Sequence, residues 1–503
     1  MAIRALYVTS EVYPLAKTGG LADVSAALPA ALRERGIDVR LVVPAYPQAL
    51  NRAPNLRVVA KLGAVPGGSD GRLLETVLHG SRIPVWLVDY PGLYNRDGGL
   101  YQAYDGQEWT DNAERFAALN AAALAIADGL VDDWRPDIVH THDWHAGLLP
   151  LLLSAREKPR PRPATIFTIH NLAYQGLFGA NEFEHLGLPP SLFQSLEFYG
   201  RISFLKAGIC GADAITTVSP TYAREILTSE YGCGLEGLLK AKEPIITGIL
   251  NGADYGIWDP RTDPALASPY SAKSMAGKLA AKRAIQVELG LDEDDSAPLM
   301  AFMSRLVHQK MPDVVLETLP ALIEEGMQFA VVAEGETAYG KAFAGLMERY
   351  KGRVGTRFGY GEPLAHRLLA GADMLAHPAR FEPCGLVPMY ALRYGTLPIV
   401  RNSGGMADSV VNATVETIQN GSATGFSFDE PTLEAFESCA RRALGFYRQP
   451  IVWRKMQASA MAQDFGWQRS AEAYARLYHR LAGIPMVERE EAAPEPVRIR
   501  IPA

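Results

Sequence analysis

Cysteine is scarce in this chain, which has four in 503 residues. Cys210, Cys233, Cys384 and Cys439 lie far apart, and no C-x-x-C pair occurs. A disulfide scaffold or a cysteine-rich zinc module needs closely spaced cysteines, so the sequence disfavours both. Separate thiols fit a reducing cytosol, and we expect a cytoplasmic protein.

Long apolar runs and an excess of positive charge are also missing. The longest apolar stretches, such as residues 121–127 and 148–153, are far shorter than the ~18–20 residues of a membrane-spanning helix. Residues 3–9 lead straight into polar and glycine residues, without the pattern of an export signal. The 49 Lys and Arg against 56 Asp and Glu give a net charge of −7. We therefore expect a protein that binds neither membrane nor nucleic acid, because binding to nucleic-acid phosphates needs a basic surface.

Short buried-strand patterns alternate with helical patterns through nearly the whole sequence. Apolar residues at i, i+3 and i+4 predict helices over residues 113–130 and 312–325, among others. This alternation is typical of parallel sheets with helices on both faces, so we predict an α/β fold of doubly wound domains. The predicted strands are residues 3–9, 39–43, 85–88, 138–140, 166–169, 214–218, 299–303, 329–333, 354–358, 374–377 and 397–400.

The length predicts two or three domains, and turn residues place a boundary within residues 242–260. A partial repeat supports this division, because residues 18–23 spell T-G-G-L-A-D and residues 403–408 spell S-G-G-M-A-D. Each copy follows a polar loop and opens a predicted helix. We predict two related domains, 1–243 and 244–464, that present helix N-termini to a shared cleft. Chance similarity between two glycine-containing loops is the alternative.

The loop that follows the first predicted strand carries two glycines and a lysine. Gly19 and Gly20 let the backbone approach a ligand closely, and the helix start offers free N–H groups to an anion beside the charge of Lys17. The loop matches neither G-x-G-x-x-G nor the G-x-x-x-x-G-K-S/T of nucleotide hydrolases, which disfavours an NAD-dependent dehydrogenase. A tight strand–helix connection with a surface lysine would have the same sequence.

The segment H-T-H-D-W-H, from His140 to His145, follows another predicted strand. Imidazole and carboxylate are ordinary zinc ligands, so His140, His142 and His145 are candidates for a metal site. The alternative is a polar strand end that faces a cleft, where ligands of open α/β sheets bind. The chain offers no second cluster of His and Asp at metal-binding spacing, and we therefore expect no metal.

Three further polar segments are candidates for a site. Arg305 and Lys310 follow a predicted strand, where they either suit a diphosphate or form a solvated face. His170 follows another strand and is either a structural histidine or a site group. Glu382 precedes a helix that is predicted over residues 387–394. Its carboxylate either caps this helix or binds sugar hydroxyls.

Taken in order, these segments resemble those of bacterial glycogen synthases and plant starch synthases, which are retaining glycosyltransferases with the two-domain GT-B fold. The similarity runs from about residue 3 to residue 481. The matching segments are K-T-G-G-L-A-D-V at Lys17, H-D-W-H-A-G at His142, H-N-L-A-Y-Q-G at His170, F-Y-G-R-I-S-F-L-K-A-G at Phe198, T-V-S-P-T-Y-A-R-E-I at Thr217, Y-G-C-G-L-E-G-L-L at Tyr231, N-G-A-D at Asn251, S-R-L-x-x-Q-K at Ser304, R-F-E-P-C-G-L at Arg380, Y-A-L-R-Y-G-T-L-P at Tyr390 and D-F-G-W-Q-R-S-A at Asp464.

The resemblance implies transfer of glucose from ADP-glucose to the 4-hydroxyl at the non-reducing end of an α-1,4-glucan, such as glycogen or a maltooligosaccharide, with retention of configuration. It implies two Rossmann-like domains that face a central cleft, the first on the acceptor side and the second on the donor side. A helix over residues 465–483 would cross back to the first domain, and no cofactor would be needed. Residues 484–503 follow it, and their Glu- and Pro-rich composition predicts a disordered tail.

The resemblance also implies two sets of site residues. Those at the transferred glucose or the departing diphosphate are His170, Arg305, Lys310, Glu382 and Asp143. Those that bind the donor or support its loop are Lys17, Gly19, Gly20, Asp23, Asn171, Cys384, Gly385 and Leu386. Two cations and a helix N-terminus can stabilise a leaving diphosphate without a metal. For retention we favour the family's mechanism, in which the acceptor attacks from the leaving-group side.

Three segments depart from the family pattern. Met311 follows Lys310 where the family usually has Gly, residues 333–337 spell A-E-G-E-T instead of G-x-G-D-P or similar, and residues 387–389 spell V-P-M instead of T-Q-L. Tyr390 stands where related GT-B enzymes often carry a second Glu, as is usual for glycogen synthases.

These departures bear on the donor rather than on the reaction type, because the charged positions remain. Glu334 adds a carboxylate near the expected diphosphate, so we expect weaker binding of ADP-glucose and some tolerance of UDP-glucose. An enzyme of the same fold with UDP-glucose as its donor, or a metallohydrolase built on His140, His142 and His145, are the alternatives.

Overall fold

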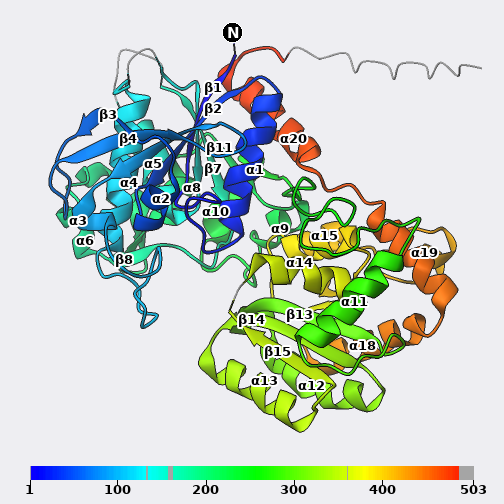
Figure 1. Cartoon of the computed structure of the whole chain (residues 1–503). Helices are drawn as coiled ribbons and strands as arrows, with labels where there is room; N and C mark the ends of the chain where they lie inside the picture. The colour runs from blue at the N-terminus through cyan, green and yellow to red at the C-terminus, as the bar shows by residue number, and fades with distance from the viewer. Residues whose placement is uncertain (1, 132–133, 157–161, 360, 487–503) are drawn as a thin grey trace, which may run out of the picture.

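The structure is a computed structural model that describes residues 2–131, 134–156, 162–359 and 361–486. Figure 1 shows two α/β halves side by side, each with a sheet at its centre, and the last helix beside the first one. The predicted tail lies outside the described residues from residue 487 on.

Within the described residues, the first half contains a nine-stranded sheet that is parallel from β12 to β5 and ends in the antiparallel strands β4 and β3. A separate antiparallel sheet consists of β8 (Leu177–Gly179), β10 (Arg201–Ser203) and β9 (Glu197–Phe198). The strands of the large sheet, in their order across it, are β12 (Ile246–Gly248), β11 (Ala214–Thr217), β7 (Ala164–Ile169), β6 (Ile138–His142), β1 (Arg4–Val8), β2 (Asp38–Pro44), β5 (Pro84–Asp89), β4 (Gly71–Val77) and β3 (Arg57–Leu62).

The second half contains a sheet of six strands in the described ranges, and all of its neighbouring pairs are parallel. A doubly wound sheet of this kind has helices on both faces, as the sequence predicts. Its strands, in order, are β15 (Val354–Phe358), β14 (Gln328–Gly335), β13 (Leu299–Leu306), β16 (Met374–His377), β17 (Leu397–Arg401) and β18 (Phe426–Phe428).

The helices alternate with these strands along the chain. Those of the first half are α1 (Gly20–Glu34), α2 (Pro47–Arg52), α3 (Pro91–Tyr94), α4 (Asn112–Ala127), α5 (Leu148–Ser154), α6 (Asn181–His185), α7 (Phe193–Leu196), α8 (Phe204–Gly211), α9 (Pro220–Glu225) and α10 (Glu236–Lys242). Those that follow are α11 (Ala276–Glu288), α12 (Pro312–Glu324), α13 (Thr337–Arg349), α14 (Glu362–Gly371), α15 (Leu386–Arg393), α16 (Gly404–Ser409), α17 (Val415–Gln419), α18 (Leu433–Tyr447), α19 (Pro450–Met461) and α20 (Trp467–Ala482). Short 3-10 helices cover Trp144–Ala146, Pro190–Leu192, Glu243–Ile245 and His308–Lys310.

All of the predicted strands are present, and seven of them are longer than predicted. Two of these extensions concern candidate site residues. The strand β13 continues to Leu306 and β14 continues to Gly335, so Arg305 and Glu334 belong to strands rather than to the loops that follow them. The sequence patterns missed β3 and β4 at the sheet edge, the small sheet of β8 to β10, and β18. The edge strand β3 is largely exposed, and it therefore lacks the continuous apolar run that marks a buried parallel strand.

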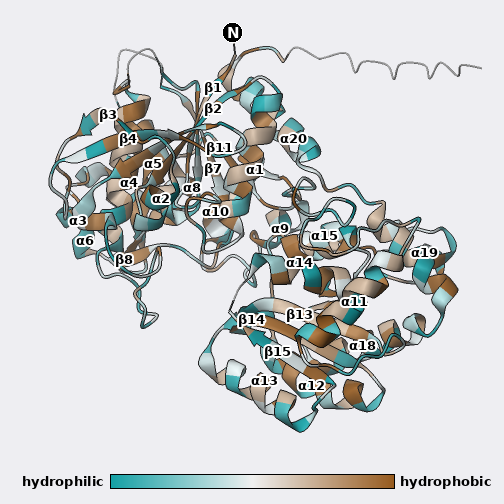
Figure 2. Cartoon of the chain, in the orientation of Figure 1, coloured by the Kyte–Doolittle hydropathy of each residue, from teal (hydrophilic) through white to brown (hydrophobic). Residues whose placement is uncertain are grey.

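The larger hydrophobic cluster buries the first sheet and extends onto one face of the second sheet through Leu299, Ala330 and Leu375. A second cluster, with Phe302, Phe329 and Met374, buries the other face of the second sheet. Figure 2 shows the brown, apolar strands β13 and β14 next to the largely hydrophilic helix α13. The last helix, α20, contacts α1 and β6 of the first half. Its Tyr478 hydroxyl lies 2.7 Å from His140 Nδ1, and the Ser470 hydroxyl donates to Leu250 O at 2.5 Å. None of the helices in the described residues combines the length and the apolar character needed to cross a bilayer.

Candidate active site

The two halves meet where strands end at their carboxyl edges. The Ser219 hydroxyl donates to Pro383 O at 2.7 Å, and the Thr221 hydroxyl donates to Asp408 Oδ1 at 2.8 Å. At Gly20, a Cβ would lie 3.3 Å from Leu386 Cδ1, so the start of α1 and the start of α15 face each other closely. The predicted donor-binding segments of the two halves are therefore brought together across one cleft.

Two N–H groups of the Gly19–Gly20 loop bind a side chain of the protein, whereas the sequence predicted that this loop offers free N–H groups to an anion. The N–H groups of Thr18 and Gly19 donate to Glu11 Oε2 at 2.6 and 3.0 Å, so they are not free for an anion. Tyr101 in turn donates to Glu11 Oε1 at 2.6 Å and holds this carboxylate in place. Glu11 was missed in the sequence analysis, because an acidic residue after a strand carries no signal of what it will contact.

Lys17 and Asp23 form an ion pair that the sequence did not predict, since Lys17 Nζ lies 2.7 Å from Asp23 Oδ1. Lys17 Nζ also lies 5.2 Å from the ring centre of Tyr13. Asp23 thereby supports the lysine from inside the first turn of α1, where a carboxylate is also favoured by the helix dipole.

Asp143 anchors the loop that carries His170. Its Oδ1 accepts hydrogen bonds from the N–H groups of His170 at 2.7 Å and Asn171 at 3.4 Å. Burial raises the pKa of Asp143 to about 7, although these two hydrogen bonds oppose the rise. Asp143 itself has a φ of 54°, a left-handed conformation that only a well-packed site maintains in a non-glycine residue. The sequence predicted these three residues in one pocket, and they are adjacent here.

The histidines of H-T-H-D-W-H do not form a metal site. His140 has both ring nitrogens engaged, with Tyr478 at 2.7 Å and Thr168 at 2.6 Å. His145 is stacked between Trp144 and Tyr101, and His142 Nδ1 lies 3.0 Å from His170 Nε2. In the part of the chain that the structure describes, the one cluster with metal-like spacing consists of other residues, Glu114, Glu182 and His185.

Lys310 and Glu382 form a direct ion pair in the second half. His377 Nε2 lies 3.0 Å from the same Glu382 oxygen. Burial alone would raise the pKa of Glu382, but the Lys310 ammonium and the His377 hydrogen bond outweigh it and hold this pKa at about 2. Glu382 is therefore a buried carboxylate that stays ionised. His377 was missed by sequence reasoning, because it ends β16 as a single polar residue of a buried strand.

Arg305 lies on the same strand, β13, that leads into the Lys310 turn. It is exposed, and its guanidinium makes no hydrogen bond or ion pair within the described residues. The turn itself is fastened to the Glu382 loop, because Arg380 donates to His308 O at 2.6 Å and Gln309 donates to Phe381 O at 3.0 Å. Two cations thus lie at the carboxyl edge of the second sheet. Arg305 makes no ion pair within the described residues, and Lys310 is paired with Glu382.

Glycines at positions 404 and 405 let the Glu382 loop pack against α16. A Cβ at Gly404 would lie 1.9 Å from Glu382 O, and one at Gly405 would lie 2.1 Å from Cys384 O. The Gly404 N–H is capped by Glu225 Oε1 at 2.9 Å. The second copy of the repeat is therefore a packing element, whose first helical N–H group binds a carboxylate of the first half.

The start of α15 remains available to a ligand. Gly385 has a φ of 81° and precedes the first turn of this helix, and neither its N–H nor that of Leu386 has a backbone partner in the described ranges. Burial raises the pKa of the Cys384 thiol to about 12, against hydrogen bonds from Asn251. Asn251 is buried and its Oδ1 has no hydrogen-bond partner among the described residues, so it is a further site candidate that the sequence analysis treated as turn chemistry.

The structure explains the departure from the family pattern at Met311, and it shows the contacts of Tyr390. Met311 has a φ of 53°, the left-handed conformation in which glycine has no Cβ penalty, and its side chain is fully buried. Tyr390 stacks on Trp258 with ring centres 4.2 Å apart and planes 2° apart, and His366 covers the other side of Trp258 at 3.8 Å. Tyr390, which lies within α15, thus packs this helix against Trp258.

Glu334 neighbours Arg305 across two parallel strands, because the register pairs these two residues. Both are exposed, and Glu334 borders a pocket of about 390 Å³ that Phe358, Gly359 and the first turn of α13 also line. Only glycine fits at position 335, because a Cβ there would lie 2.6 Å from Leu306 O. The chain keeps this glycine although the residues around it depart from the family pattern.

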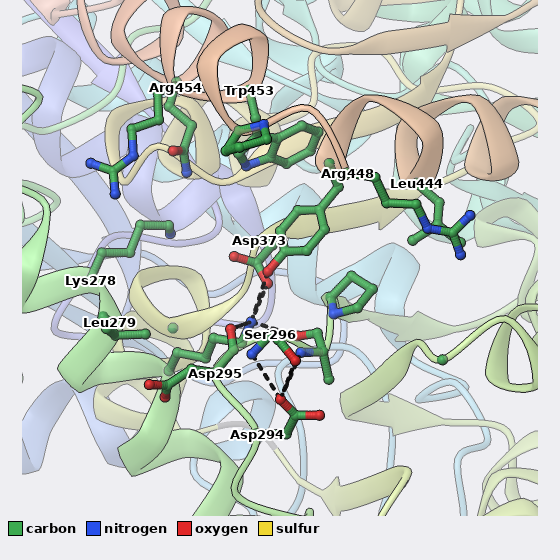
Figure 3. Close-up of a pocket in the computed structure, with 18 of the residues that line it drawn as sticks. Lys278, Leu279, Asp294, Asp295, Ser296, Asp373, Leu444, Arg448, Trp453 and Arg454 are labelled. Carbon is green, nitrogen blue, oxygen red and sulfur yellow. Dashed lines mark hydrogen bonds and ion pairs between the residues drawn. The ribbon is translucent and has the colours of Figure 1, made fainter.

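A larger pocket, of about 630 Å³, lies at the opposite edge of the second sheet (Figure 3). Asp373, Pro298 and Gly326 line it at the amino ends of strands. The Lys282 ammonium donates to Asp373 Oδ2 at 2.8 Å and to Ala297 O at 2.5 Å. Lys278 donates to Thr396 Oγ1 at 2.7 Å, so both buried lysines are engaged in fastening α11 to this edge. Ligands of open α/β sheets bind at the carboxyl edge, which is where the predicted residues converge.

Two doubly wound sheets that face a cleft, with cations and a helix N-terminus on the second wall, define the molecule as a glycosyltransferase of the GT-B type. The family model of the starch synthase catalytic domain matches residues 4–241, and that of glycosyl transferases group 1 matches residues 285–444. Both confirm the predicted class of enzyme.

Comparison with individual proteins narrows the class of glycosyltransferase. The chain is 49% identical to a glycogen synthase of Burkholderia thailandensis over 494 residues, covering 97% of this chain and 92% of the relative. It is 50% identical to one from Thioalkalivibrio sulfidiphilus, covering 95% and 99%. The catalytic domain of starch synthase IV from Arabidopsis thaliana, solved with ADP and acarbose, superposes with a TM-score of 0.85 at 30% identity, covering 96% of this chain and 100% of that one. The chain belongs to the family of bacterial glycogen synthases and starch synthases.

Proposed function

We propose that this enzyme transfers glucose from ADP-glucose to the 4-hydroxyl at the non-reducing end of an α-1,4-glucan, with retention of configuration. The observation that carries the proposal is the Lys310–Glu382 ion pair at the carboxyl edge of the second sheet. Arg305, which has no ion-pair partner within the described residues, lies at the same edge. The diphosphate of a nucleotide sugar binds to cations, and the hydroxyl groups of its neutral sugar donate hydrogen bonds to a buried carboxylate. The ADP and acarbose in the starch synthase IV structure support the same pair of substrates.

The donor diphosphate lies, in this proposal, between Arg305, Lys310 and the N–H groups at the start of α15. Charge grows on the diphosphate as the bond to glucose breaks, and preorganised cations and helix N–H groups stabilise that charge in the transition state. From the first wall, Lys17 approaches the same phosphates. Glu11 occupies two N–H groups of that loop, so the contribution of the first wall comes from Lys17 and the N–H of Gly20.

The transferred glucose lies between Glu382 on the second wall and the His170 loop on the first. An ionised Glu382 accepts hydrogen bonds from sugar hydroxyls, and its low pKa keeps it in this form at neutral pH. Asp143 holds the His170 and Asn171 backbone in place, and Asn171 and Asn251 complete the pocket. The acceptor hydroxyl then attacks from the face that the diphosphate leaves.

The domain roles follow from this placement. The predicted boundary between residues 243 and 244 falls just before β12, which pairs with β11 in the first sheet. We therefore propose that residues 1–248 form the acceptor side and residues 249–464 the donor side, and that the helix within 465–483 joins them. We also place the enzyme in the cytoplasm, which the free state of all four cysteines supports.

The direct test is to incubate the enzyme with glycogen and either ADP-glucose or UDP-glucose, and to measure nucleotide release together with incorporated glucose. We expect ADP release equal to the glucose that enters α-1,4 linkages. The variant Arg305→Gln should lose most of the activity. Arg454→Gln removes the same charge from the pocket of Figure 3 and should not, which makes it the matched control. A preference for UDP-glucose would refute the donor assignment, and no transfer from either donor would refute the proposal.

A further inference from the structure

His142 is held in the first wall by aromatic contacts on both sides. Its ring stacks on Tyr7 with centres 3.9 Å apart and planes 28° apart, and the ring of His140 lies at 4.1 Å. The side chain is completely buried, at 0% exposure. Its Nδ1 lies 3.0 Å from His170 Nε2, and its Nε2 has no hydrogen-bond partner in the described part of the chain.

Both members of this histidine pair are neutral. Burial lowers the pKa of His142 well below its usual value, and burial lowers that of His170 to about 3. Two neutral imidazoles share one proton in the hydrogen bond between them, so either His142 Nδ1–H donates to His170 or His170 Nε2–H donates to His142.

The unpartnered nitrogen decides between these two arrangements. If His170 donates, His142 must carry its proton on Nε2, where a buried N–H would find no acceptor. If His142 donates from Nδ1, its Nε2 is a bare acceptor, and a buried acceptor without a partner costs less than an orphaned N–H. The second arrangement leaves His170 with its proton on Nδ1. That nitrogen makes no hydrogen bond within the described residues, and His170 is only partly buried.

We infer that His142 is a positioning residue, which donates from Nδ1 to His170 Nε2 and thereby keeps His170 in the tautomer whose Nδ1–H is presented to the transferred glucose. The part of this inference that concerns glucose rests on the proposed function, since it places the sugar beside His170. The tautomer itself depends only on the contacts of the two histidines. A donor at this position binds a hydroxyl oxygen, whereas the other tautomer would offer only an acceptor.

Nitrogen NMR of the enzyme labelled with ¹⁵N-histidine reads the tautomer directly. The His170 signals are identified by their loss in His170→Asn. In the wild type we expect His170 with a protonated Nδ1 and a bare Nε2, without any substrate present. A His170 with its proton on Nε2 would overturn the inference, whatever the enzyme's activity proves to be.

Two variants separate positioning from packing. His142→Asn retains an N–H near the place of Nδ1, whereas His142→Leu has a similar size and no donor. With Leu we expect a mixture of His170 tautomers and a kcat about 10- to 100-fold lower, the usual range for losing a partner that orients a site group, at an unchanged KM for ADP-glucose. With Asn we expect the Nδ1–H tautomer and most of kcat to return. Equal losses in both variants at equal thermal stability, or an unchanged tautomer with Leu, would refute the role.

Discussion

Replacing Lys310 with methionine should destabilise the protein mainly through the charge that it leaves on Glu382. The two side chains are 14% and 10% exposed, so the carboxylate would lose its main partner in a place with little solvent. The Lys310 ammonium, together with the His377 hydrogen bond, holds the pKa of Glu382 at about 2 instead of 4.5, against burial. A shift of this size corresponds to about 3 kcal/mol, which is the upper bound for the loss of Lys310 alone. This stabilisation is complete above about pH 4.5 and is lost as the pH falls towards 2, because protonation of Glu382 then removes the charge.

Calorimetry of Lys310→Met, Glu382→Gln and the double variant tests this reasoning. For a domain of about 220 residues, a loss of up to about 3 kcal/mol lowers Tm by up to about 6–12 °C in Lys310→Met at pH 7. The double variant should recover most of that loss, because it leaves no buried charge behind, while His377 keeps an oxygen to contact. Lys310→Met should also lower kcat/KM by about 10²- to 10³-fold, the effect of removing one preorganised charge at a transition state. Additive losses in Tm would refute the coupling.

Three further outcomes follow from the site. Glu334→Gln should lower KM for ADP-glucose several-fold, because one like charge near a diphosphate is worth on the order of 1 kcal/mol. KM is measured for both nucleotide sugars, and equal values in the variant and the wild type would contradict this. Met311→Gly should lower Tm, since relieving a left-handed residue returns about 1 kcal/mol while deleting a fully buried Met side chain loses about 2–3 kcal/mol of burial. A higher Tm would show that strain dominates. Gly404→Ala should displace the Glu382 loop and abolish transfer. Gly445→Ala, in helix α18 and with nothing within 4 Å of its new Cβ, should fold and retain activity. Similar activities of the two variants, measured as ADP release, would refute the packing argument.

The strands of this protein were predictable where helices cover both faces of the sheet. Such strands must be apolar at nearly every position, and the fully buried strand β16 (Met374–His377) begins and ends where the sequence pattern does. The edge strand β3 has exposed side chains on much of its length, so its sequence shows no such pattern. Strand ends that carry charged residues were also cut short in the prediction, because Arg305 and Glu334 continue the hydrogen-bonded ladder while their side chains reach solvent.

By itself, the sequence determined the class of fold, the family and most residues of the candidate site, because each of these is written in local patterns and in short motifs around strand ends. Only the tertiary structure decided how those residues are used. It paired Lys310 with Glu382, brought Glu11 onto the loop at Gly19, and placed His142 against His170. These contacts join residues from separate segments of the chain, and a buried polar group is satisfied by whichever neighbour the packing brings near. Such a neighbour leaves no trace in the sequence around either residue.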